Sequence, residues 1–203
     1  MKHFGLIFLW LCLCAGALQG ATPIAGSHHV DAATLTEFVR RHNPDFSMEI
    51  AEAFIEIGDR YGIRGDIALC QAILETGWFR FDKGTAVTPD MHNYCGLGVT
   101  SRGDRGCAFA SVREGVEAML QHLYAYCCAD PLPDGLDIVD PRFALVTRGS
   151  APAWEDLSGR WAANPAYGAN ILSLFARAAA LSPVTRVEVI EVDIPDELFV
   201  SDF

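Results

Sequence analysis

A glutamate near the end of an apolar helical pattern is the residue best suited to acid–base chemistry. Glu75 follows an apolar run that begins at Ile67, and Gly77 comes two residues later, where it would end the helix. The negative end of a helix and the neighbouring aromatic residues Trp78 and Phe79 both disfavour a charged carboxylate. Both effects predict a raised pKa, and a carboxyl group that stays protonated can protonate the leaving oxygen of a glycosidic bond. By position alone, an ordinary surface glutamate near a helix end is equally open.

Four segments of the chain resemble, in the same order, the glucosaminidases of glycoside hydrolase family 73. Residues 65–79 resemble the family's catalytic helix, and residues 93–98, with the sequence Asn-Tyr-Cys-Gly-Leu-Gly, resemble its Asn-aromatic-x-Gly turn. Residues 109–115 resemble the stretch that opens the next helix. Residues 161–167 resemble a Tyr-Ala-x-Asp-Pro-x-Tyr segment, with Trp for the first Tyr and Asn for the Asp. The resemblance covers roughly residues 31–181.

This resemblance implies a lysozyme-like fold and hydrolysis of the β-1,4 bond between N-acetylglucosamine and N-acetylmuramic acid in peptidoglycan. In the family's Glu-Thr/Ser-Gly motif the Glu is the general acid, which implies that role for Glu75, and Tyr167 becomes the tyrosine near the catalytic centre. A core aromatic at Tyr167 and simple turn-shaping by residues 93–96 remain open. The expected substrate-binding residues are Gln71, which lies one helical turn before Glu75, together with Trp78, Asn93, Tyr94 and Gly96.

The second catalytic group is less defined. A glycosidase normally pairs its acid with another carboxylate, and the family's proposed partner lies in a hairpin lobe some thirty-odd residues after the acid. Here Asp104 is the only carboxylate in residues 99–106, so it is the candidate, although it also suits an exposed turn. We therefore favour assistance by the substrate's N-acetyl group or a loosely held base, with Tyr167 polarising the reacting groups.

The pattern of apolar residues predicts a mainly α fold. Asp31, Ser47, Asp66 and Ser111 are candidate helix caps. Glycine-rich residues 79–109 predict a loop with a short β-hairpin, which would form a small lobe beside the active-site cleft of the lysozyme-like domain. The expected helices cover residues 31–43, 47–62, 67–75, 111–131, 154–161 and 167–182.

The chain is expected to divide into four parts. Residues 1–21 predict a signal peptide, with a basic Lys2, an apolar run over residues 4–13 and small residues after it. A linker (22–30), the glucosaminidase domain (31–182) and an acidic tail (183–203) follow. A retained membrane anchor is the alternative. We expect a secreted or cell-envelope protein, with no stable membrane span after cleavage.

Charge and cysteine content restrict the partners. The formal net charge of −11 disfavours nucleic acid. Five cysteines follow the signal, so at least one thiol stays free or pairs between molecules, and Cys95 with Cys107 is the best disulfide candidate. His92 near these cysteines matches no standard zinc spacing, so no metal or cofactor is expected. The expected partner is the glycan strand of peptidoglycan, bound by a monomer.

Other functions remain open at this point. A lytic transglycosylase or a muramidase uses one Glu on the same fold but cuts the other glycosidic bond. An inactive wall-binding module would keep the cleft and lose turnover.

Overall fold

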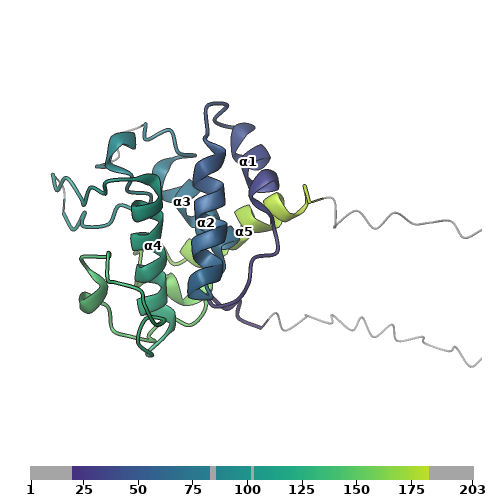
Figure 1. The fold of residues 1–203 in the computed structure, drawn as a ribbon. Coiled ribbons are helices and arrows are strands. Elements are labelled where there is room, and N and C mark those ends of the chain that lie inside the picture. The colour runs from purple at the N-terminus through teal and green to yellow at the C-terminus, as the bar shows by residue number, and fades with distance from the viewer. Residues whose placement is uncertain (1–19, 83–85, 102, 183–203) are drawn as a thin grey trace, which may run out of the picture.

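The computed structural model describes residues 20–82, 86–101 and 103–182 (Figure 1). Nearly all of the expected signal peptide and the whole acidic tail, residues 183–203, lie outside the described residues. The described part is mainly helical, as predicted, and no helix in it is long and apolar enough to cross a membrane. Its elements are α1 (Ala32–Arg40), α2 (Met48–Tyr61), α3 (Gly65–Thr76), α4 (Val112–Cys127), α5 (Tyr167–Ala179) and the short 3-10 helices η1 (Pro89–Met91), η2 (Phe143–Leu145) and η3 (Trp154–Leu157).

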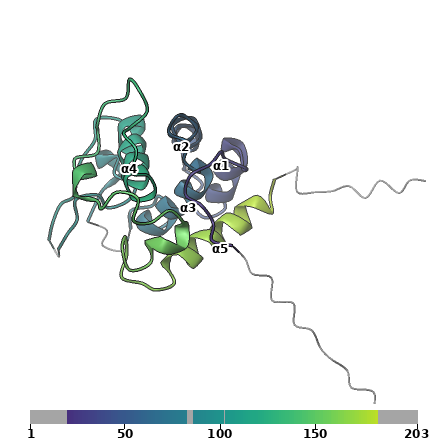
Figure 2. The ribbon, with the colours of Figure 1, turned by 90° about the horizontal axis from the view of Figure 1, so that it is seen from below.

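Helix α2 is the centre of the fold. It contacts α1, α3 and α4, while α5 packs on α3 and η3 (Figures 1 and 2). Two long segments with only short 3-10 helices complete the fold: the described residues between α3 and α4 (77–82, 86–101 and 103–111) and residues 128–166 between α4 and α5, where η2 packs on α4 and η3 packs on α5. The helices therefore form the rigid base, and the two irregular segments supply the rest of the functional site.

Helix α3 is buried on all sides over most of its length. Its apolar residues from Ile67 to Ile73 are at most 1% exposed. It approaches α2 very closely, because a Cβ atom at Gly65 would lie 2.0 Å from the carbonyl oxygen of Phe54. Glu75, near the C-terminal end of α3, is thus carried by the most tightly enclosed element of the fold.

The structure confirms the expected helix caps Asp31 and Ser111, whose hydroxyl accepts from the Glu114 amide (3.2 Å), and corrects another. Asp31 accepts a hydrogen bond from the Thr34 amide (2.7 Å), as an N-cap does. Asp66 is not a cap, because α3 begins one residue earlier, at Gly65. Its carboxylate is instead fully buried and ion-paired with Arg64 (2.9 Å).

Residues 22–30, expected as a linker, pack against the helical body. Ile24 and Val30 are buried in the core, and the amides of His29 and Val30 donate hydrogen bonds to the Asp66 carboxylate (2.7 and 3.2 Å). A buried carboxylate needs such donors. The segment is therefore integral to the fold.

The expected β-hairpin lobe is absent from the described residues, which form only isolated bridges elsewhere. Between α3 and α4, the Cys107 amide donates to the Leu97 carbonyl (2.7 Å), but no ladder continues from this bond. The Asn93 side chain bridges the two sides instead, because its amide donates to the carbonyls of Leu97 and Cys107 (both 2.9 Å). The lobe is an irregular loop built around a side chain.

Two further expectations were wrong. The helix predicted over residues 154–161 is only the short η3, and Trp161 follows it in a turn. The Cys95–Cys107 disulfide is not formed, and all five cysteines of the described residues are free thiols. Cys95 is buried, with its backbone amide donating to Asn93 (3.4 Å), and burial raises the pKa of its thiol well above the usual range.

Candidate active site

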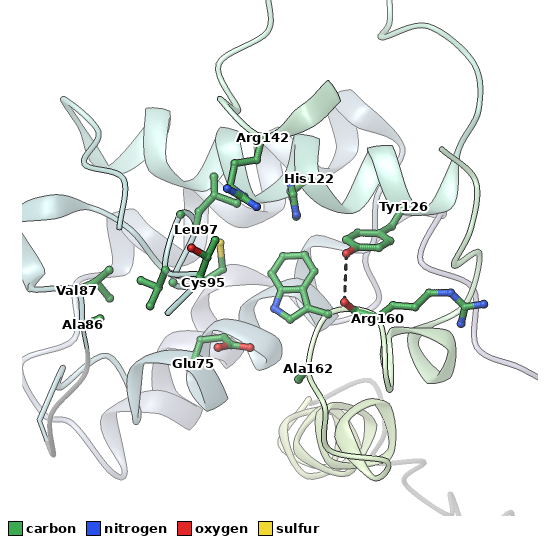
Figure 3. Close-up of a pocket in the computed structure, with 15 residues that line it drawn as sticks. Glu75, Ala86, Val87, Cys95, Leu97, His122, Tyr126, Arg142, Arg160 and Ala162 are labelled. Atoms are coloured by element: carbon green, nitrogen blue, oxygen red, sulfur yellow. Dashed lines mark hydrogen bonds between the residues drawn. The ribbon is translucent and has the colours of Figure 1, made fainter. Parts of the chain in front are cut away.

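A pocket of about 450 Å³ opens between the end of α3, one face of α4 and the two irregular segments (Figure 3). Its polar and aromatic lining includes Glu75 on α3, His122 and Tyr126 on α4, Trp161 in the segment before α5, and also Thr100, Arg142 and Arg160. Its floor is completed by small and aliphatic residues of the first irregular segment, among them Gly96 and Leu97. Distant parts of the sequence therefore meet around one carboxyl group.

Glu75 points its carboxyl group into this pocket. Burial raises the pKa of Glu75, whereas hydrogen bonds from Tyr167 and Trp161 work in the opposite direction and only partly offset it. The raised pKa agrees with the expectation from the sequence. A raised pKa favours the protonated form of this carboxyl group, which can donate its proton to a bound ligand.

Two residues behind the pocket fix the position of this carboxyl group. The Tyr167 hydroxyl donates a hydrogen bond to Glu75 Oε1, and Gln71 Nε2 donates to the Tyr167 hydroxyl oxygen (2.9 Å). Burial, followed by the nearby Glu75 charge, raises the pKa of Tyr167 far above its ordinary value, so its hydroxyl stays protonated and remains a donor. The sequence placed Gln71, Glu75 and Tyr167 at the site, and the structure joins them in one hydrogen-bonded chain.

The turn after η1 borders the pocket at Gly96, while the side chains of Asn93 and Tyr94 are buried in the protein. Asn93 is 0% exposed, and besides donating twice it accepts a hydrogen bond from the Leu97 amide (2.9 Å). Gly96 lines the pocket with a positive φ of 65°, which favours glycine. Tyr94 packs in the core against Phe79 and lines a separate pocket of about 510 Å³. Among these three expected binding residues, only Gly96 reaches the surface of the pocket beside Glu75.

Two other expected site residues, Trp78 and Asp104, do not line this pocket, although Asp104 bonds to Thr100, which does. The Trp78 ring stacks on His42, with 3.7 Å between ring centroids, and the Arg177 guanidinium lies over its face. Asp104 accepts hydrogen bonds from the hydroxyl and amide of Thr100 (2.7 and 2.9 Å) and from the Ser101 amide (2.7 Å). These bonds, led by the Thr100 hydroxyl, lower the pKa of Asp104 to about 2. The carboxylate of Asp104 therefore stays charged and holds its own turn.

Comparison with known proteins connects this geometry to a family. The profile of the glucosaminidase family, described as mannosyl-glycoprotein endo-beta-N-acetylglucosaminidase, matches residues 51–180, which include Glu75, Gln71 and Tyr167. The chain belongs to the glucosaminidase family. This membership confirms the family resemblance carried by the four sequence segments.

One curated relative of this glucosaminidase-family chain is an uncharacterized protein of Borreliella burgdorferi (strain ATCC 35210 / DSM 4680 / CIP 102532 / B31). The two are 35% identical over 137 residues, which is 66% of this chain and 65% of the relative. The match thus spans less than two thirds of that protein's length. No solved structure matches the chain.

Four pocket residues of this family member were not expected from the sequence: His122, Tyr126, Arg142 and Arg160. His122 and Tyr126 are one turn apart on α4, a spacing that places both on one helix face, and this was an available signal. The His122 ring forms edge contacts with Tyr126 and with Trp161 (centroids 5.4 and 5.1 Å apart), and the Tyr126 and Trp161 rings are tilted against each other (5.8 Å). The two arginines lie in an irregular segment without periodicity, so no sequence pattern placed them.

Proposed function

We propose that this chain hydrolyses the β-1,4 bond between N-acetylglucosamine and N-acetylmuramic acid in peptidoglycan, with Glu75 as general acid. The single observation that carries the proposal is the Glu75 carboxyl group, which faces an open pocket with a raised pKa. Glycoside hydrolysis needs such a protonated carboxyl group beside the bond that breaks. Family membership supports the class of reaction.

The proton moves from Glu75 to the leaving glycosidic oxygen as the bond to the anomeric carbon breaks. Loss of that proton leaves a carboxylate, and the donors on Tyr167 and Trp161 stabilise this charge as it forms. Gln71 holds the Tyr167 hydroxyl in place (2.9 Å) without reaching the pocket lining itself. The hydrogen-bonded chain thus stabilises the carboxylate that Glu75 becomes after it has given up its proton.

The second catalytic group is proposed to come from the substrate. Glu75 is the only carboxylate among the described residues that line the pocket. The carboxylate of Asp104 is instead hydrogen-bonded to the Thr100 hydroxyl in its own turn. The carbonyl oxygen of the N-acetyl group can bond to the anomeric carbon while the leaving sugar departs with the proton of Glu75. The Glu75 carboxylate then takes a proton from water, which attacks the anomeric carbon and releases the N-acetyl group. Substrate-assisted families are recorded exceptions to the two-carboxylate rule.

Analysis of the products from purified peptidoglycan tests this proposal. The proposed reaction releases fragments with N-acetylglucosamine at the reducing end, which mass spectrometry after borohydride reduction identifies. A muramidase would release reducing N-acetylmuramic acid, and a lytic transglycosylase would release its anhydro form. Absence of any fragment would favour an inactive wall-binding module.

We further propose that the protein acts outside the cytoplasm as a monomer. The support is the predicted signal peptide and the peptidoglycan substrate class. N-terminal sequencing of protein recovered outside the cytoplasm should begin between about Leu18 and Thr22. Recovery of intact Met1 in that fraction would contradict export with cleavage, and light scattering of the purified chain measures its oligomeric state.

A further inference from the structure

The pocket beside Glu75 is bordered by positive charge in an acidic protein. Arg142 and Arg160 line it, and Glu75 is the only acidic residue in the lining, within the described part of the chain. Figure 3 shows the Arg142 guanidinium across the pocket from Glu75, whereas the Arg160 side chain extends outward, away from Glu75, and its backbone oxygen accepts a hydrogen bond from the Tyr126 hydroxyl (3.4 Å). Because the whole chain carries a formal charge of −11, this pocket locally reverses the prevailing charge and would attract an anionic group.

The acid nearest to Arg142 in sequence does not neutralise its guanidinium. Asp140 is 1% exposed, and its Oδ2 lies 2.7 Å from His122 Nδ1. Its other oxygen accepts a hydrogen bond from the backbone amide of Arg142 (2.8 Å). The buried Asp140 therefore anchors the backbone of Arg142 to α4 while leaving the charged end of the side chain facing the pocket.

Arg160 likewise has no carboxylate partner among the described residues. Its Nη1 donates to the backbone carbonyl of Asp156 (3.0 Å), whereas the Asp156 carboxylate accepts from the Ala153 amide (3.1 Å). Within the described residues, neither pocket arginine forms an ion pair with a carboxylate. Five other arginines do so: Arg41, Arg60, Arg64, Arg80 and Arg113.

We propose that Arg142, assisted by Arg160 at the outer end of the pocket, binds a carboxylate carried by the substrate glycan; this rests on the proposed hydrolysis of peptidoglycan. A guanidinium group matches a carboxylate with two parallel hydrogen bonds, and charge-assisted bonds of this kind are strong. The carboxylate has two possible sources with the same chemistry. One is the lactyl group of N-acetylmuramic acid without a peptide, and the other is the stem peptide attached to that group.

Equilibrium binding separates this inference from catalysis. Calorimetry with the Glu75→Gln full-length chain, which cannot deliver the proton, compares three ligands. These are the disaccharide of N-acetylglucosamine and N-acetylmuramic acid, the same disaccharide with its lactyl carboxylate converted to a methyl amide, and the disaccharide bearing a stem peptide. We expect at least one carboxylate-bearing ligand to bind about 10- to 100-fold more tightly than the amide.

Arginine variants in the same background assign that preference. Arg142→Gln should abolish it, and Arg160→Gln should reduce it by a smaller factor because this side chain lies farther out. Arg113→Gln on the exposed face of α4, where Arg113 pairs with Glu56 (2.8 Å), is the matched control and should retain it. Preference for the free lactyl group or for the peptide form identifies which source supplies the carboxylate.

Three results would overturn the inference: equal binding of the amide and both carboxylate-bearing ligands, a preference that survives in Arg142→Gln, or no binding at all. None of them decides the proposed function, which depends on the fragments that the native chain releases from peptidoglycan. Conversely, a native chain without turnover but with an Arg142-dependent preference would refute hydrolysis and keep the carboxylate site.

Discussion

Glu75 and Asp104 are the two acids that the sequence predicted to be catalytic, and their surroundings shift their pKa values in opposite directions. Glu75 sits on the enclosed helix α3, where burial raises its pKa. Asp104 sits in a glycine-rich loop, where hydrogen bonds led by the Thr100 hydroxyl lower its pKa to about 2. The difference shows how surroundings set the role of a carboxyl group. Burial raises its pKa and suits it to donate a proton, whereas several nearby hydrogen-bond donors lower its pKa and keep it as a charged acceptor that stabilises a turn.

Replacing Glu75 by Gln should give the largest loss of turnover among the variants that test this contrast. The neutral amide keeps the shape of the side chain but has no proton to deliver, so turnover of purified glycan should fall by about 10²–10⁴-fold or more. Circular dichroism should show an unchanged fold. Turnover near that of the native chain would remove Glu75 from the role of general acid.

Replacing Tyr167 by Phe should give the next largest loss, about 10- to 100-fold, because the variant cannot stabilise the carboxylate that forms on Glu75. The sign of the accompanying pH effect is fixed by the structure. The Tyr167 hydrogen bond lowers the pKa of Glu75, so its removal raises that pKa further. Activity requires protonated Glu75 and is lost as pH rises through its pKa, so the alkaline limb of the pH–rate profile should move to higher pH. Movement to lower pH would contradict this assignment.

Replacing Gln71 by Leu should reduce turnover by about 3- to 10-fold, since the Tyr167 hydroxyl loses the donor that orients it. Stability should change by less than about 1 kcal/mol, because the buried Gln71 Oε1, which has no partner among the described residues, disappears too.

Gln121→Leu is the matched control for this variant. Gln121 is equally buried, but its oxygen accepts from the amides of Val139 and Asp140 (2.8 and 2.9 Å), so its loss should cost about 2–4 kcal/mol of stability. Thermal melting and initial rates of both variants decide the matter. A Gln71→Leu chain that melts as early as Gln121→Leu would indicate a purely structural residue.

Replacing Asp104 by Asn should have the smallest effect, within about tenfold in turnover. The amide oxygen can still accept from Thr100 and Ser101, and the lost charge lies outside the pocket lining. Assay on the same glycan as Glu75→Gln makes the comparison direct. If both variants were equally inactive, a two-carboxylate mechanism would operate and the role proposed for the substrate would be wrong.

The helices could be predicted because their signals are local. Asp31 caps α1 as expected, and Gly62 ends α2 in a left-handed conformation. The start of α3 could not be placed in this way, because a long-range demand overrides local capping preference at Asp66. Its carboxylate forms an ion pair with Arg64 and accepts a hydrogen bond from the His29 amide. Likewise, the Asn93 side chain donates hydrogen bonds to the carbonyls of Leu97 and Cys107, and spacing alone does not reveal these contacts.

The candidate site divides in the same way. Gln71 and Glu75 share a face of one helix, so their proximity follows from periodicity, and the family resemblance added Tyr167. Arg142 and Arg160 depend on how an irregular segment folds back over α4, and this path is set by buried contacts such as that between Asp140 and His122. Trp78 and Tyr94 illustrate the converse, because both were expected to bind substrate, yet Trp78 stacks on His42 and Tyr94 is buried in the core.

The close approach at Gly65 has a consequence for how this protein can fail. Residue 65 and Glu75 are opposite ends of one stiff rod, so a methyl group added at the first would push on the Phe54 carbonyl and tilt the rod that carries the second. Misplacement of a catalytic group by about 1 Å can cost about 10²-fold in rate. The position of the Glu75 carboxyl group is therefore set some three helical turns away, and a chain altered there could fold and still lack turnover.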